Sequence, residues 1–266
     1  IGSEAGVHRL QDGQVTTLTE KDGLSYTSVR ALHEDRSGSL WIGTLGGGLN
    51  RLRSGTNTVF RKQDGLVSDM VLALDEDSEG VLWIGTEGGL NRFKEGHLTG
   101  FTAREGLPDE LVNQIVEDDL GHLWIGGSRG IYRLNRQQLN AVADGKEASL
   151  QVVSFDQSDG LLESKTNGGR SQPAAGKTRD GRLWFSTPKG AVVIDPRSIQ
   201  RNDLPPPVVI EQALADSKPV FTDGRSAAET EQPPKMIDSR PLAALGPEDS
   251  SPERTPSPIR LSPGRG

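Results

Sequence analysis

The sequence predicts an all-β chain made of four-stranded β-propeller blades, and three observations carry this prediction. One pattern recurs over residues 23–52, 65–93 and 106–134, which places Trp residues at positions 41, 83 and 124, roughly 40 residues apart. The chain holds 33 Gly among 266 residues and only 33% hydrophobic residues, which is typical of short strands joined by tight turns. A β-type repeat of this length lies in the propeller range.

Each repeat can be divided into the strands of one antiparallel blade. Residues 29–32 are apolar and strand-like, and the turn that follows them closes on Gly38, where a positive φ is accessible to Gly. Residues 40–42 are apolar in succession, as expected for a strand buried on both faces. Residues 49–52 begin a third strand, and Phe60 lies in a fourth.

These patterns predict the domain boundaries along the chain. A fourth, looser copy contains Trp184 and lacks the Glu-Asp pair, having Arg179-Asp180-Gly181. We expect half a blade over 1–19, blades over 20–63 and 64–104, a blade with an extra loop over 105–159, and a last, looser blade over 160–200. The extra residues 135–159 are either a functional loop or a tolerated bulge, and we favour the bulge.

The repeated residues have structural interpretations that we prefer to chemical ones. The Trp of each repeat is expected to pack between blades. The Glu-Asp pairs at 34–35 and 76–77 are expected to serve the turn, with Asp accepting backbone N–H groups near the Gly. A metal or acid–base role is disfavoured, because a catalytic site is rarely copied in every repeat.

The composition argues against several classes of function. The net charge of −7 and the lack of a Lys/Arg cluster argue against nucleic-acid binding. Because the chain has no Cys, it can form neither disulfides nor thiol-based metal sites. No apolar run approaches the ~20 residues that a membrane-spanning helix needs. The four His residues, His8, His33, His97 and His122, show no metal-ligand spacing. We therefore predict no catalytic, metal or cofactor residues and no cofactor.

The sequence does not identify a ligand site. Five polar or aromatic residues could line a blade face: Tyr26, Arg30, Arg129, Tyr132 and Lys189. Because the pattern does not say which face binds, the ligand-binding residues stay unknown at this stage.

The unit GL…V..(I/L).ED..G.LWIGT..GGL.R(L/F) resembles the two-component regulator propeller repeat over about residues 1–195. Departures are Gly127 in place of Thr, and Phe185-Ser186-Thr187 in place of Ile-Gly-Thr. In this family, an immunoglobulin-like β-domain commonly follows the propeller, and residues 205–221 resemble its first strand. Residues 222–266 lack aromatic residues and hold 8 of the 16 Pro, so we expect them to be disordered.

The resemblance implies a non-catalytic, ligand-sensing region of a bacterial two-component protein, the C-terminal part of a larger propeller on the periplasmic face of the inner membrane. It implies a membrane-anchored, dimeric parent with a histidine kinase or diguanylate cyclase output, and a small molecule such as a saccharide, or a protein, as partner. The chain itself is expected to contact neither membrane nor nucleic acid. Alternatives are a propeller lyase or hydrolase, and a soluble interaction scaffold, although the Gly-His and Trp-Asp signature of WD repeats is absent.

Overall fold

A computed structural model describes residues 1–168, 173–199, 212–215 and 218–222. The described residues up to 199 belong to one compact unit, and the hairpin of β19 (Gln212–Ala215) and β20 (Lys218–Thr222) belongs to another. The rest of the segment expected to begin an immunoglobulin-like domain lies outside the described residues, as does the tail beyond Thr222.

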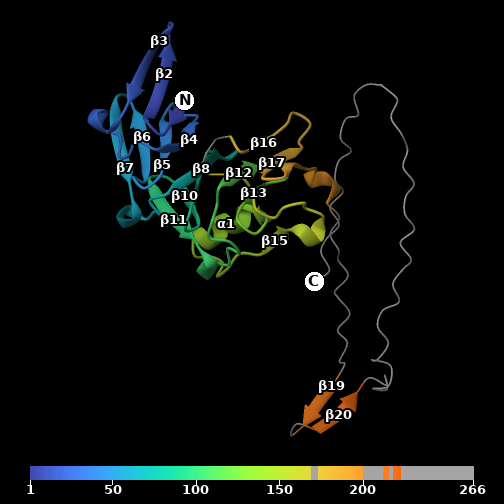
Figure 1. Ribbon diagram of the computed structural model, residues 1–266. Coiled ribbons are helices and arrows are strands. Elements are labelled where there is room, and N and C mark those ends of the chain that lie inside the picture. Colours follow the sequence, from blue (N-terminus) through green and yellow to red (C-terminus); the bar gives the residue numbers. More distant parts are fainter. Residues whose placement is uncertain (169–172, 200–211, 216–217, 223–266) are drawn as a thin grey trace, which may run out of the picture. The chain divides into compact units, whose positions relative to one another are not determined.

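The first unit is a partial β-propeller, which confirms the predicted fold class (Figure 1). Blade 1 contains β1 (Gly2–Ser3), β2 (Gly6–Gln11) and β3 (Gln14–Leu18). Blade 2 contains β4 (Val29–Glu34), β5 (Leu40–Thr44), β6 (Leu49–Arg53) and β7 (Thr56–Phe60). Blade 3 contains β8 (Val71–Glu76), β9 (Leu82–Thr86), β10 (Leu90–Lys94) and β11 (His97–Phe101). Blade 4 contains β12 (Gln114–Glu117), β13 (His122–Gly126), β14 (Ile131–Asn135) and β15 (Val152–Phe155). Blade 5 contains β16 (Ala175–Lys177), β17 (Leu183–Thr187) and β18 (Gly190–Ile194).

Helical segments connect these strands. Four of the 3₁₀ helices precede the first strand of a blade: η1 (Glu20–Asp22), η2 (Lys62–Asp64), η3 (Ala103–Glu105) and η4 (Gln157–Asp159). A fifth, η5 (Pro196–Ser198), follows β18, and the single α-helix of the described residues, α1 (Arg136–Ala143), follows β14.

Successive blades meet along their first strands, β4 against β8, β8 against β12 and β12 against β16. Glycines in the second strands permit this approach. A Cβ on Gly43 would lie 2.6 Å from Cγ1 of Val71 in the next blade, and one on Gly85 would lie 2.5 Å from the carbonyl oxygen of Val112. Any larger residue at these positions would push neighbouring blades apart.

The repeated Trp residues pack between blades, as predicted. The ring of Trp41 lies edge-on to Phe93 of the next blade, with centroids 4.8 Å apart, and only 1% of the residue is exposed. Trp83 belongs to a core cluster that includes Val112 and Leu123 of blade 4. Each buried indole therefore joins its own blade to the following one.

The Asp of each Glu-Asp pair has the predicted turn role and a second role that the sequence analysis missed. Oδ1 of Asp35 accepts the backbone N–H groups of Ser37 at 2.9 Å and Ser39 at 2.8 Å, while Oδ2 accepts the indole N–H of Trp41 at 2.7 Å. Burial raises the pKa of this carboxyl, but the hydrogen bonds that it accepts, first from the Ser37 hydroxyl and then from the Trp41 indole and the backbone, outweigh burial and bring the pKa down to about 2.

The Asp–Trp hydrogen bond recurs in blades 3 and 4 and is missing from blade 5. Asp77 accepts from Trp83 at 2.9 Å, and the equivalent bond between Asp118 and Trp124 is 2.8 Å long. In blade 5, Thr178 stands six residues before Trp184, and the buried indole nitrogen of Trp184 has no hydrogen-bond partner among the described residues.

In blades 3 and 4 the Glu of the pair contacts the preceding blade instead of its own turn, which corrects the prediction for this residue. Oε2 of Glu76 accepts the backbone N–H of Arg36 in the preceding blade at 3.0 Å, and Oε2 of Glu117 accepts that of Ser78 at 2.7 Å. In blade 5 the position is Lys177, whose Nζ lies 2.7 Å from Oδ1 of Asp119. The pair thus combines a turn residue with a contact between blades.

The insertion in blade 4 forms a packed helix rather than the tolerated bulge favoured from sequence. Oδ1 of Asn135 caps α1 by accepting the backbone N–H of Gln138 at 3.0 Å. Leu139 is fully buried and shares a core cluster with Trp83 and Leu134. The insertion therefore adds to the core between blades 3 and 4.

Removing the Asp–Trp hydrogen bond should destabilise the unit, and supplying it to blade 5 should stabilise it. Asp77→Ala leaves the buried Trp83 indole and two turn N–H groups without their acceptor, so we expect a loss of about 3 kcal/mol in the free energy of unfolding. Thr178→Asp gives Trp184 a carboxylate, and combining it with Asp180→Ser avoids two facing carboxylates and restores the hydroxyl that Ser37 supplies in blade 2, so we expect a gain of about 1 kcal/mol for the double variant. Urea unfolding measures both.

Glu110→Ala is the control. Because Glu110 is exposed, this variant should keep the free energy of unfolding within about 0.5 kcal/mol of the wild-type value. A Thr178→Asp, Asp180→Ser variant no more stable than wild type would show that Trp184 gains nothing from an acid at this position.

Candidate functional site

The first strands of the blades enclose an open pocket with a volume of about 500 Å³, which we call the inner-strand pocket. It is lined by Gly2, Val29, Arg30, Ala31, Leu32, His33, Leu74, Asp75, Ile115, Pro173 and Ala175. Residues from β1, β4, β8, β12 and β16 meet here because these strands run next to one another. Only three of the eleven lining residues are ionisable, namely Arg30, His33 and Asp75.

Arg30 places a positive charge in this pocket, and no buried acid forms an ion pair with it among the described residues. Its side chain is 11% exposed, and its buried Nε has no hydrogen-bond partner among the described residues. Its nearest acid is Glu4, whose Oε1 lies 3.6 Å from Nη2 and whose side chain is 83% exposed. A buried guanidinium with an unused donor can bind an anionic or carbonyl oxygen that enters the pocket.

The carboxyl group of Asp75 is a weaker acid than an ordinary aspartic acid. Its burial, and next the nearby charge of Glu117, raise the pKa of Asp75 to about 7, although the backbone N–H of Glu117 opposes this rise by donating to the carboxylate. Near neutral pH the carboxyl can therefore either donate or accept a hydrogen bond. On the neighbouring strand, Nε2 of His33 lies 3.5 Å from Oε2 of Glu76.

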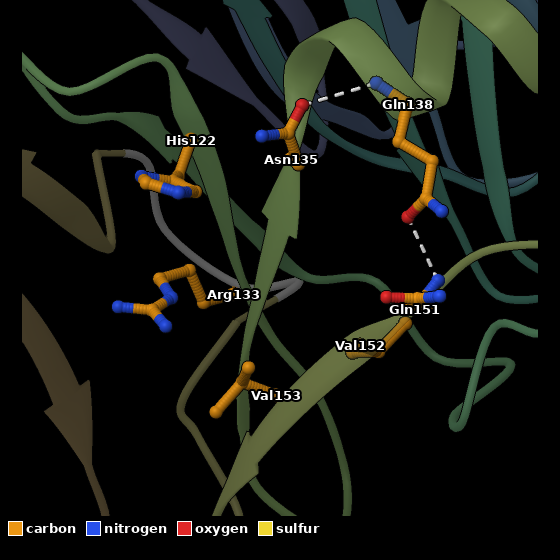
Figure 2. A pocket seen from close by; sticks show the side chains of 7 residues that line it. All are labelled: His122, Arg133, Asn135, Gln138, Gln151, Val152 and Val153. Atoms are coloured by element: carbon orange, nitrogen blue, oxygen red, sulfur yellow. Dashed lines mark hydrogen bonds between the residues drawn. The ribbon is translucent and has the colours of Figure 1, made fainter. Parts of the chain in front are cut away.

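A second kind of pocket recurs on the blade faces, where an Arg of the third strand covers the repeated Trp. We call these pockets the Arg–Trp grooves. In blade 4, the guanidinium carbon of Arg133 lies 5.8 Å from the ring centroid of Trp124. The groove beside it has a volume of about 490 Å³ and is lined by His122, Arg133, Asn135, Gln138, Gln151, Val152 and Val153 (Figure 2).

The Arg–Trp groove of blade 2 has walls from two blades. The guanidinium carbon of Arg51 lies 5.0 Å from the centroid of Trp41, and Phe93 of blade 3 completes the apolar floor. The groove has a volume of about 550 Å³, and its rim carries both charges, including Arg36 and Glu79.

The five polar residues singled out from the sequence do not form one site. Arg30 lines the inner-strand pocket, whereas Tyr26 is 43% exposed and Nζ of Lys189 lies 3.7 Å from Glu163. Two of the five lie together elsewhere: the buried Asp109 carboxylate accepts the Tyr132 hydroxyl at 3.4 Å and the Arg129 backbone N–H at 2.9 Å. The sequence analysis did not identify Asp75 and His33 as pocket residues. The feature that could have identified them is an ionisable residue within the otherwise apolar first strand of a blade.

Other site types find no support in the described residues. None of the His, Asp and Glu residues that the structure describes gather into a group of three or more that could hold a metal ion. Across the same residues, no helix is long and apolar enough to span a membrane.

Comparisons with known proteins identify the repeats. A family model for the two component regulator propeller matches residues 23–46, 65–88 and 106–129. The extracellular domain of a hybrid two-component system from B. thetaiotaomicron matches with a TM-score of 0.66 and 21% identity, over 83% of this chain and 30% of that chain. A second such domain from B. thetaiotaomicron matches with a TM-score of 0.58 and 22% identity, over 74% and 28%.

The virginiamycin B lyase from Staphylococcus aureus matches more distantly, with a TM-score of 0.49 and 14% identity, over 69% of this chain and 56% of the lyase. No curated protein sequence matches the chain. The chain spans less than a third of the length of the two extracellular domains from B. thetaiotaomicron. The likeness to these two domains establishes the propeller fold.

The raised pKa of Asp75 predicts a pH dependence of stability. Between about pH 4 and pH 7 the unfolded state ionises this carboxyl while the folded state keeps its proton, so stability falls as the pH rises through this window. Asp75→Asn should remove up to about 4 kcal/mol of that fall, measured by urea unfolding at about pH 4, 6 and 8.

Asp180→Asn is the matched control. The Thr178 hydroxyl first, and Arg182 as well, lower the pKa of Asp180 to about 2, so this group should not titrate in the same window. Equal pH slopes for wild type and Asp75→Asn would show that Asp75 titrates normally in the folded protein.

Proposed function

We propose that the chain is a non-catalytic, ligand-sensing region of a bacterial signal-transduction protein, because three of its repeats match the model of the two component regulator propeller. The inner-strand pocket, with the unused donor of Arg30 beside Asp75, is the observation that carries this proposal. The similarity to extracellular domains of hybrid two-component systems supports a parent protein with a histidine kinase output and a periplasmic location for this region.

The pocket favours a small polar ligand with an acidic group. Arg30 offers charge-assisted hydrogen bonds to a carboxylate, and Asp75 can accept from or donate to a hydroxyl near neutral pH. Leu32, Leu74 and Ile115 provide apolar surface for a ring or chain. A carboxylated sugar combines these properties, which agrees with a saccharide as the signal.

The position of the pocket also supports a relay. Its lining comes from strands of five blades, and the contacts between these strands are the contacts between blades. A ligand that joins β4 to β8 would therefore change the spacing or stiffness of neighbouring blades. That change is the signal that a linked output domain would receive.

The nature of the parent protein is tested by sequencing the genomic DNA on both sides of the region that encodes this chain. We expect further LWIGT repeats upstream, and a transmembrane helix and a kinase or cyclase downstream. A short, complete propeller with neither a membrane helix nor a signalling domain would contradict the sensor proposal and favour a scaffold or lyase.

Binding in the inner-strand pocket is tested with glucuronate and galacturonate, with glucose as the uncharged comparison. We expect the uronates to raise the melting temperature, corresponding to about 2.7 kcal/mol at 100 times Kd, and glucose to have a smaller effect. Arg30→Ala should abolish the uronate shift, and differential scanning fluorimetry provides the measurement.

Arg104→Ala is the matched control, because Arg104 lies in η3, away from the pocket lining. It should keep the full uronate shift. A shift of equal size in Arg30→Ala would place uronate binding outside the inner-strand pocket.

A further inference from the structure

Three arginines occupy the same place in successive blades. In the antiparallel pairs of second and third strands, Arg51 lies opposite Trp41, Arg92 opposite Trp83, and the Arg of blade 4 opposite its own Trp. The surroundings of these arginines can therefore be compared directly.

In blade 3, the helix α1 covers this arginine. Nη1 of Arg92 donates to Oδ1 of Asn140 at 2.7 Å, and Nη2 donates to Oδ1 of Asp144 at 2.9 Å. The preceding residue of the helix, Leu139, is fully buried in the core cluster that contains Trp83. Arg92 is only 7% exposed as a result.

The opposite end of α1 is held by acids. Arg136 forms ion pairs with Glu117 of blade 4 and with Glu79 of blade 3, the latter at 2.8 Å. The helix thus binds across two blades through a cation at its start, a leucine in its middle and a carboxylate just beyond its end.

In blade 2, nothing in the described part of the chain covers the equivalent arginine. Nε of Arg51 donates to the Ser39 hydroxyl at 3.1 Å, and no acid of the described residues forms an ion pair with Arg51. Arg51 is partly exposed and lines the groove together with Trp41 and Phe93. The rim acid Glu79 has a side chain that is 54% exposed.

We propose that the Arg–Trp groove of blade 2 binds an amphipathic helix of a partner protein, in the manner in which blades 3 and 4 hold α1. Trp41 and Phe93 are buried beneath the Arg51 side chain, so the partner helix packs its apolar face on the aliphatic part of Arg51 and places an Asn or Asp on its guanidinium. Charge complementarity favours an acid opposite Arg51, because a carboxylate there makes the hydrogen bond that Asp144 makes with Arg92. This docking surface lies apart from the inner-strand pocket, so neither proposal depends on the other.

The test uses a fluorescent peptide with the sequence of residues 135–150 as a stand-in for the partner helix, and the full 266-residue chain. We expect saturable binding by fluorescence anisotropy and a loss of at least about tenfold in affinity for Arg51→Glu, which replaces an attraction with a repulsion. A peptide carrying Asp144→Lys should bind wild type poorly and recover affinity for Arg51→Glu.

Two further variants separate the outcomes. Arg104→Ala should bind the peptide like wild type. Arg51→Lys keeps the positive charge and should retain part of the affinity, so it provides the test should Arg51→Glu fail to fold. Absence of saturable binding would overturn the proposal. Binding that is insensitive to Arg51 but lost in Arg92→Ala would also overturn it, because the peptide would then be replacing α1 in its own place.

Discussion

The hydrogen bond between the turn Asp and the buried Trp is the interaction on which the rest of this repeat depends. An indole placed between two blades buries a large apolar surface but also carries an N–H that needs a partner. Asp35 supplies the partner for Trp41 and holds two backbone N–H groups of its turn with its other oxygen. One carboxylate thus fixes the turn and positions the ring that contacts the next blade, so turn, core and blade interface cannot vary independently.

Blade 5 shows what happens when one part of this arrangement changes. Thr178 stands where the other blades have Asp, and the Trp184 indole nitrogen is left without a partner among the described residues. The neighbouring Lys177 replaces the Glu, yet it still reaches the preceding blade, because that blade offers Asp119 instead of a backbone N–H. The contact between blades is therefore kept with the opposite charge, while the bond within the blade is lost.

The sequence was sufficient for the features that repeat. Burial of Trp41 and the turn role of Asp35 follow from residues that recur with the same spacing, and the constant separation of six residues between Asp and Trp could also have indicated their bond. Helix α1 could not be predicted as packed structure, because its segment has no counterpart in other repeats. The pocket was missed because register shifts interrupt the pairing after Val29 and Val71, and a shift of one residue changes the face on which a side chain lies.

The proposed ligand and the proposed partner would act on different parts of the same interface between blades 2 and 3. Arg30 and Asp75 lie on the first strands, where Gly43 allows the blades to approach closely. Arg51 covers the Trp41 ring, which contacts blade 3 through Phe93. Because closely packed interfaces resist small displacements, a change in spacing imposed at the first strands has to be taken up at the aromatic contact. Ligand and partner binding would then be coupled in both directions, since coupling between two sites is reciprocal.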